Sequence, residues 1–206
     1  MAAVRAVVFD VGGVLEHHGD FGFTSRWERR LGLEPGELFG RIRRSGLGRD
    51  GNLGMVSEAE FDRALGTLFG LDLRRTGELL DDLWDWYAGP LNTEVAAYFQ
   101  SLRPRYRTAI LSNAAAGGVR REEERYRFSA MADVLVYSFE EGVQKPDHRI
   151  YLRTCERLGV PPEAAVFLDD VEDNVVAARE VGMRGVQFRD TAQAIADVEA
   201  CLRDGA

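Results

Sequence analysis

Five short apolar runs recur along the chain, each rich in Val, Ala, Ile, Leu or Phe. They cover Val4 to Phe9, Thr108 to Leu111, Val134 to Tyr137, Ala164 to Leu168 and Gly185 to Phe188. Nearly continuous apolar character, without the alternation of a half-exposed strand, is typical of strands that are covered on both faces. The runs therefore predict five buried β-strands.

Segments with apolar residues at helical spacing separate these runs. They cover Glu94 to Leu102, Gly118 to Phe128, His148 to Leu158, Asn174 to Val181 and Ala192 to Leu202. Strands that alternate with helices favour an α/β fold with a doubly wound parallel sheet.

The stretch between the first two strands breaks this alternation, because it contains no strand-like run. It predicts four helices, over Thr24 to Leu33, Pro35 to Ser45, Ser57 to Phe69 and Arg75 to Tyr87. Pro35 suits the first position of a helix, and Ser57 with Glu60 fits a capping box. The pattern predicts a core of residues 1–16 and 90–206 with a small helical domain, 17–89, inserted over the carboxyl ends of the strands.

Composition narrows the class of protein. The 206 residues suit one domain of ordinary size with a smaller insert. With 26 basic and 34 acidic residues the net charge is −8, so we expect no nucleic acid among the partners. The apolar N-terminal run meets Asp10 too early for a membrane span or a signal segment. Because Cys155 and Cys201 lie far apart, without a metal-binding or redox pattern, we expect a cytoplasmic protein with no membrane partner.

Polar residues follow three of the predicted strands. Asp10 follows the first, Ser112 and Asn113 the second, and Asp169 with Asp170 the fourth. In a parallel sheet these ends lie at one edge, where ligands bind. A single Asp at such a place is commonly a turn or cap residue, but two adjacent carboxylates repel each other unless a cation or a donor separates them. Carboxylates are the usual ligands of Mg²⁺, and Asp10 could also be a nucleophile.

Lys145 is the exception in the basic composition, because the other 25 of the 26 basic residues are arginine. Its compact ammonium can lie between a carboxylate and a phosphate, where a planar guanidinium needs a wider site. Ser112 and Asn113 offer a hydroxyl, an amide and backbone N–H groups, which can hold phosphate oxygens. Without these neighbours, a surface lysine and an ordinary helix cap would be the simplest interpretations.

Four segments together resemble the motifs of the haloacid dehalogenase-like hydrolases. They are Asp10 to Leu15, Ser112-Asn113, Lys145 to Asp147, and Asp169 to Asn174. The resemblance covers essentially the whole chain and implies a Rossmann-like core with a helical cap inserted after the first strand. It is strongest with the subgroup of sugar-phosphate phosphatases and the phosphatase domain of epoxide hydrolases.

The resemblance also implies a reaction and the residues that perform it. Asp10 would attack phosphorus to form an aspartyl phosphate, which water then hydrolyses. Ser112 and Asn113 would bind the phosphoryl group of a small phosphorylated metabolite, and Lys145 would stabilise both this group and Asp10.

A Mg²⁺ cofactor is implied in the same way. Its ligands would be the Asp10 carboxylate, the backbone carbonyl of Gly12 and the acidic pair. Alignment with the family's usual ending makes Asp170 the direct ligand and places Asp169 at a glycine position. Asn174 would support the ligands from behind.

Gly12 departs from the family pattern. Most family phosphatases have an aspartate at this position, which acts as general acid and base, and loss of such a group typically costs roughly 10²- to 10⁴-fold in rate. Nearby side chains that could substitute are Glu16, His17, His18 and Asp20. The hypothesis that follows is a preference for aryl and acyl phosphates over alkyl phosphates.

Two other functions stay open. A 2-haloacid dehalogenase also lacks the second aspartate, but it needs no metal and carries no acidic pair, so Asp169-Asp170 favours the phosphatase. A catalytically weak relative that binds a phosphorylated metabolite would explain Gly12 but not the nucleophile. The substrate and the oligomeric state are left open.

Two further patterns have structural interpretations. The segment 120–125 mixes arginine and glutamate at helical spacing, which predicts a solvated helix face. Trp84 and Trp86 fall in one predicted helix and are expected to pack the cap onto its neighbours, with a place in the lining of a substrate pocket as the alternative for one of them.

Overall fold

The computed structural model describes residues 3–203 and confirms the five predicted strands within that range. They are β1 (Ala6–Phe9), β2 (Arg107–Ser112), β3 (Val134–Tyr137), β4 (Ala165–Asp169) and β5 (Arg184–Gln187). All neighbouring pairs are parallel, in the order β3-β2-β1-β4-β5. The central strand β1 is fully buried, as its continuous apolar sequence predicts.

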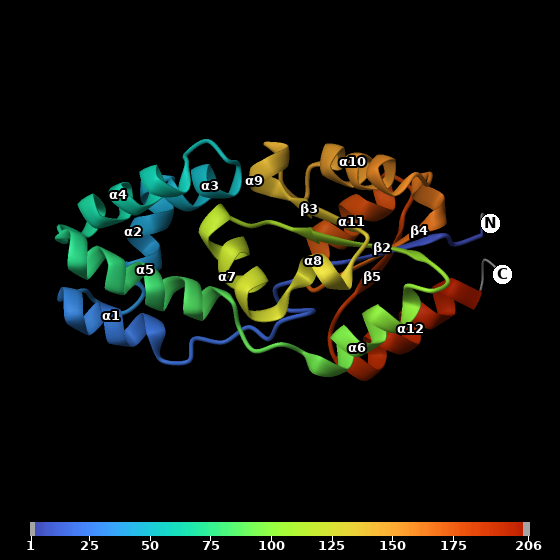
Figure 1. Cartoon of the computed structure of the whole chain (residues 1–206), viewed down its shortest axis with the longest axis horizontal. Helices are drawn as coiled ribbons and strands as arrows, with labels where there is room; N and C mark the ends of the chain where they lie inside the picture. Colours follow the sequence, from blue (N-terminus) through green and yellow to red (C-terminus); the bar gives the residue numbers. More distant parts are fainter. Residues whose placement is uncertain (1–2, 204–206) are drawn as a thin grey trace.

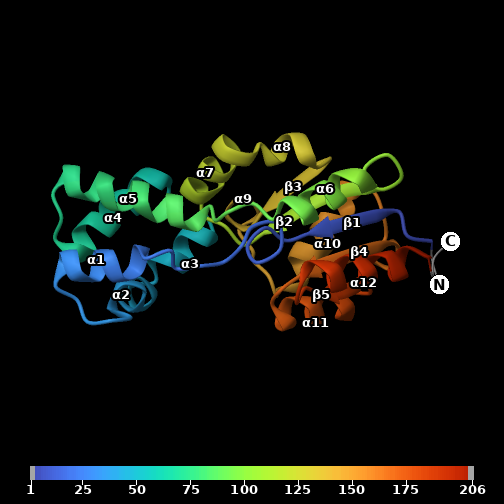
Figure 2. The ribbon, with the colours of Figure 1, turned by 90° about the horizontal axis from the view of Figure 1, so that it is seen from below.

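Helices cover both faces of this sheet (Figures 1 and 2). They are α6 (Thr93–Leu102), α7 (Ala116–Tyr126), α8 (Phe128–Met131), α9 (Ser138–Glu141), α10 (His148–Leu158), α11 (Glu172–Glu180) and α12 (Thr191–Arg203), with a short 3₁₀ turn at Pro162–Ala164. Side chains from α6 and α12 pack on one face, and those from α10 and α11 on the other. The doubly wound α/β fold is therefore confirmed.

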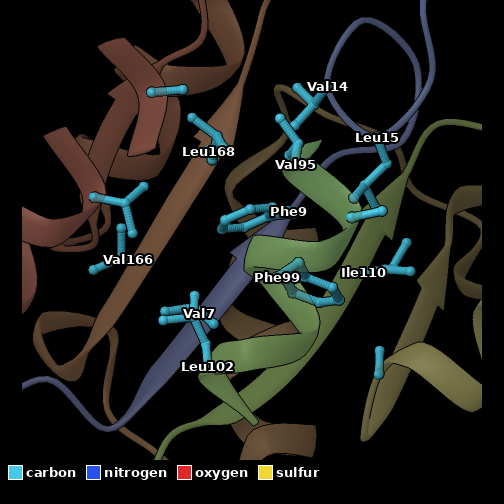
Figure 3. Close-up of a cluster of buried hydrophobic side chains, with 14 of the residues drawn as sticks. Val7, Phe9, Val14, Leu15, Val95, Phe99, Leu102, Ile110, Val166 and Leu168 are labelled. Carbon is cyan, nitrogen blue, oxygen red and sulfur yellow. The ribbon is translucent and has the colours of Figure 1, made fainter. Parts of the chain in front are cut away.

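The apolar layer beneath α6 shows how the alternating sides of β1 divide between the two faces. Phe9 packs against Phe99 of α6, with ring centroids 4.8 Å apart, beside Val7, Ile110 and Leu168 (Figure 3). The intervening residues of β1 point to the opposite layer, under α10 and α11. Full burial of each large apolar side chain contributes about 1.5–3 kcal/mol, so β1 is anchored from both sides.

One predicted helix of the core has the wrong length. The pattern predicted a single helix over Gly118 to Phe128, but α7 ends at Tyr126 and α8 starts at Phe128. Arg127 lies between them in the left-handed region, with φ 53°, so the helix cannot continue through it. The turn directs Phe128 into the apolar layer beneath the sheet.

The inserted segment forms five helices with an apolar core of their own. They are α1 (Phe23–Leu31), α2 (Glu37–Ser45), α3 (Leu47–Asn52), α4 (Glu58–Phe69) and α5 (Leu73–Tyr87). The capping box is confirmed, because Ser57 and Glu60 exchange hydrogen bonds at the start of α4. The prediction for Pro35 is wrong, since α2 begins at Glu37 after Gly36 (φ 85°). The glycine-rich sequence of α3 concealed that helix.

Two chain crossings join the cap helices to the sheet. The backbone of Glu16 pairs with that of Leu91 in the other crossing, and His17 N donates to Pro90 O at 2.8 Å. This contact holds α1–α5 beyond the carboxyl end of β1 (Figure 2). The domain boundaries stay predictions, because their outer ends, residues 1 and 206, lie outside the described residues. No helix within 3–203 combines the length and apolar character needed to cross a bilayer.

Candidate active site

The order of the strands brings three of the predicted site segments together. Because β1 lies between β2 and β4, Asp10 stands between Ser112 and Asp169 at one edge of the sheet. In the parallel register Phe9, which precedes Asp10, pairs with Leu168, which precedes Asp169. The sequence-predicted convergence of these strand ends is therefore present in the structure.

Lys145 joins two of the strand ends. Its Nζ lies 2.7 Å from Asp10 Oδ1 and 2.6 Å from Asp169 Oδ2, and its side chain is 1% exposed. An ammonium with three donors can bridge two carboxylates in this way, whereas a buried lysine without partners would lose its proton. Asp10 and Asp169 outweigh the effect of burial and raise the pKa of Lys145, so it stays charged.

The two adjacent aspartates differ in their surroundings. Asp169 is fully buried and accepts hydrogen bonds from Asn174 Nδ2 at 3.0 and 3.1 Å and from Val171 N at 2.8 Å. Asp170 is half-buried and faces the cavity, with one carboxylate oxygen 3.7 Å from His18 Nε2. Asp169 thus anchors Lys145, while Asp170 has oxygens available for a ligand.

A hard cation fits these donors. One carboxylate oxygen from each of Asp10, Asp169 and Asp170 lies within 4.8 Å of the others. When all three are ionised, they leave excess negative charge beside a single lysine, and oxygen ligands are those that Mg²⁺ prefers. The chemistry of the donor set therefore agrees with the predicted metal ligands.

Burial controls the protonation of the predicted nucleophile. Burial raises the pKa of Asp10 to about 7, with Asp169 acting in the same direction and Lys145 against both. Burial and the charge of Asp169 also raise the pKa of Asp170. A bound cation would favour the ionised form of both groups, so metal binding would convert Asp10 into a carboxylate at neutral pH.

Ser112 and Asn113, the predicted phosphoryl-binding pair, have different surroundings. Ser112 is buried at the end of β2 and lines the cavity beside Asp10. The Asn113 amide also reaches the cavity, but it exchanges hydrogen bonds with the backbone of Lys145, at 2.8 and 2.9 Å. Asn113 therefore fixes the backbone that carries Lys145.

Comparison with known proteins now assigns the family. The haloacid dehalogenase-like hydrolase family matches residues 4–182, which include every strand end described above except that of β5. The chain belongs to the haloacid dehalogenase-like hydrolases.

Similar proteins of this family include phosphatases. The D-ribitol-5-phosphate phosphatase of Bacteroides thetaiotaomicron is 25% identical, over 89% of this chain and 91% of that protein. Bifunctional epoxide hydrolase 2 of Sus scrofa is 28% identical over 96% of this chain. The chain spans 38% of the pig protein and smaller shares of the mouse and rat relatives that it matches.

A solved structure supports the same fold. A haloacid dehalogenase family enzyme from Bacteroides thetaiotaomicron, in complex with magnesium and inorganic phosphate, superposes with a TM-score of 0.79. The two are 20% identical, and the match covers 91% of this chain and 95% of that chain.

The two glycines of this haloacid dehalogenase-like site adjoin His18 and Asp170. A Cβ on Gly12 would lie 2.9 Å from His18 Cε1, so the imidazole occupies the space of a side chain at position 12. Gly13 has φ +77°, and a Cβ there would lie 2.4 Å from Asp170 Oδ2. Glycine at position 13 thus permits the close approach of the Asp170 carboxylate.

The four candidates to replace the missing aspartate have separate positions. Glu16, His17 and His18 line the cavity with Asp10. Asp20 does not line the cavity. Its carboxylate accepts a hydrogen bond from Thr24 N at the start of α1, and hydrogen bonds from the side chain and backbone of Thr24 lower the pKa of Asp20. His18 is the candidate whose ring stands over Gly12.

Glu122 is a cavity residue that the pattern of charges along the sequence does not indicate. The segment 120–125 was expected to be solvated, but Glu122 is 1% exposed and lines the cavity with Tyr87 and Trp86 of the cap. Glu122 lies four residues after Gly118, and therefore on the helix face that packs against Tyr87. The four-residue spacing from Gly118 could have indicated that Glu122 is buried, but the charged residues around Glu122 favoured a solvated face instead.

Proposed function

We propose that this protein is a Mg²⁺-dependent phosphatase that hydrolyses a small phosphorylated metabolite through an aspartyl phosphate on Asp10. The observation that carries the proposal is the cluster of Asp10, Asp169 and Asp170 around the buried ammonium of Lys145. The phosphatase names of similar proteins agree with it. A metal-independent dehalogenase has no need for the acidic pair.

In the first step a carboxylate oxygen of Asp10 attacks phosphorus, the ester P–O bond breaks, and the leaving-group oxygen takes up a proton from water to depart as the alcohol. Water then attacks phosphorus, the bond to Asp10 breaks, and inorganic phosphate leaves. Lys145 neutralises charge beside Asp10, and Ser112 offers a hydroxyl to the phosphoryl oxygens. Asp10, Asp170 and the Gly12 carbonyl would hold Mg²⁺, which supplies charge neutralisation when bound. Asn174 keeps Asp169 oriented toward Lys145.

The size of the cavity limits the substrate. Its volume is about 240 Å³, it is partly open to solvent, and it is lined by core residues together with His17, Trp86 and Tyr87. This volume accommodates a phosphoryl group together with a small organic leaving group. We infer that the substrate is small.

The cytoplasmic location, and the expectation of no nucleic-acid or membrane partner, stay predictions from composition.

The test measures phosphate release from sugar phosphates, nucleotides and small organic phosphates, with Mg²⁺ and with EDTA. We expect release that needs Mg²⁺ and that falls to background in Asp10→Asn. Chloride release from a 2-haloacid that is insensitive to EDTA would instead support a dehalogenase. Binding of a phosphorylated metabolite without turnover, and without modification of Asp10 by beryllofluoride, would support the weak, ligand-binding relative that Gly12 suggests.

A further inference from the structure

Two buried glutamates line the cavity with carboxylate oxygens that lack a well-formed hydrogen bond. Glu16 is 2% exposed and Glu122 is 1% exposed. Within the described part of the chain, no group meets normal hydrogen-bond geometry with either carboxylate oxygen of Glu16 or with Oε2 of Glu122, although the backbone N–H of Gly89 is close enough to act on Glu16. Each unpartnered buried polar group costs about 1–3 kcal/mol, so native proteins contain few of them. The unpartnered oxygens point to a partner that the protein itself does not supply.

The surrounding arginines do not hydrogen-bond to these oxygens, although the charge of Arg125 acts on Glu16 and lowers its pKa against the effect of burial. Arg125 donates to Ala88 O at 2.6 Å and to Asp85, and Arg121 pairs with Asp81 and Asp85 on α5. These arginines tie α7 to the cap instead of entering the cavity. Glu16 comes from the chain crossing and Glu122 from α7, so the two carboxyl groups reach the same cavity from different elements.

We propose that Glu16 and Glu122 form a subsite that accepts hydrogen bonds from hydroxyl or ammonium groups on the leaving group of the substrate. The inference rests on the proposed phosphatase function and adds the chemical class of the substrate. Donors on the substrate would satisfy the three unpartnered oxygens, whereas an apolar leaving group would leave them unsatisfied. A site built to bond a donor rejects an analogue that lacks it more strongly than an apolar pocket rejects a size change.

Hydroxyl and ammonium donors differ in one respect. An ammonium also stabilises the ionised form of Glu16 and Glu122, whose pKa values burial raises, in the cavity that Lys145 lines as well. A hydroxyl supplies only the hydrogen bond. Replacing a carboxylate by an amide keeps the acceptor but removes the charge, so Glu122→Gln separates the two kinds of substrate.

The experiment compares three phosphates with the same three-carbon chain in the presence of Mg²⁺. Glycerol 3-phosphate carries hydroxyls, 3-aminopropyl phosphate an ammonium, and propyl phosphate neither. We expect kcat/KM for at least one donor-bearing substrate to exceed that for propyl phosphate by tenfold or more. In Glu122→Met this ratio should fall below threefold. In Glu122→Gln, a hydroxyl substrate should keep most of its advantage and an ammonium substrate should lose it.

A thermal measurement separates binding from structure. Removing an unpartnered buried carboxyl should leave the Tm of Glu122→Met unchanged or higher, whereas a structural glutamate would lower it. The control is Glu124→Gln, an exposed carboxyl on the same helix, which should retain the wild-type ratio. Equal kcat/KM values for all three substrates, with Mg²⁺-dependent phosphate release, would overturn the subsite alone. No phosphate release from these or from an aryl phosphate would overturn the proposed phosphatase.

Discussion

At the scale of single residues, Gly12 and His18 compete for one volume. The imidazole lies where a side chain at position 12 would extend, yet the His18 side chain itself is largely exposed. An aspartate at position 12 can therefore enter only if His18 shifts. Glycine at position 12 and the position of the His18 ring therefore depend on each other.

We expect restoration of the aspartate to need both changes. The double variant Gly12→Asp/His18→Ala should raise kcat/KM for alkyl phosphates by at least roughly tenfold and reduce the preference for aryl phosphates, because a positioned acid protonates a poor leaving group. Gly12→Asp alone should gain less. The measurement is kcat/KM over a leaving-group series, with His18→Ala as control. Identical relative rates in all four proteins would contradict the idea that position 12 limits leaving-group departure.

The residues of the site were not equally predictable. Lys145 stood out because a lysine is rare in this arginine-rich chain, and the structure places it between two carboxylates. Asn113 was recognised as a site residue, but its bonds to the Lys145 backbone depend on a loop brought close only by folding. Glu122 was misread because burial of a charged helix position depends on the element packed against it, which local sequence does not reveal.

At the scale of elements, two small residues set the distance between the cap and the core. A Cβ on Gly117 would lie 2.5 Å from the Trp84 ring, and one on Gly118 would lie 2.6 Å from the Tyr87 ring. These glycines let α7 approach α5 closely enough for Tyr87 and Glu122 to line one cavity. Ion pairs from Arg121 add little to this contact, because their partners are exposed.

Gly117→Ala should therefore destabilise the protein and disturb the site together. The added methyl group overlaps the buried Trp84 ring, and overpacking of this kind costs typically about 1–3 kcal/mol. Gly77→Ala on α5 is the control, because nothing lies within 4 Å of its Cβ. It should stabilise the helix by about 0.5–1 kcal/mol. Urea unfolding of both variants checks the opposite signs, and a stable Gly117→Ala would show that α5 and α7 separate at little cost.

The helices and strands of the core could be predicted from the sequence because their burial gives a clear pattern of apolar residues. Strands covered on both faces have continuous apolar runs, and the helices between them show clear periodicity, so both were predictable. The short helices α3 and α9 were not predicted, because a six-residue and a four-residue helix give too few turns for a periodic pattern. Their formation depends on contacts with the cap and the sheet.

At the scale of the whole molecule, the cavity concentrates acidic groups that burial keeps from ionising. Burial raises the pKa of Glu16 to about 8 and that of Asp10 to about 7, and it raises the pKa of Glu122 as well. In the unfolded chain these groups ionise near their ordinary values. Between about pH 4 and pH 8 the folded protein therefore holds more protons than the unfolded chain, and its stability falls as the pH rises.

The metal-free protein should therefore unfold at lower urea concentration as the pH increases from 5 to 9. For Glu16 alone the loss is at most about 5 kcal/mol. Glu16→Gln should flatten this dependence, with a relative gain in stability above pH 8, while the exposed control Glu124→Gln should follow the wild type. Addition of Mg²⁺ should restore stability at high pH, because the cation binds the ionised cluster of the folded state. Parallel pH profiles for wild type and Glu16→Gln in EDTA would show that Glu16 ionises as readily in the folded protein as in the unfolded chain. Burial of Glu16 would then make no contribution to the pH dependence of stability.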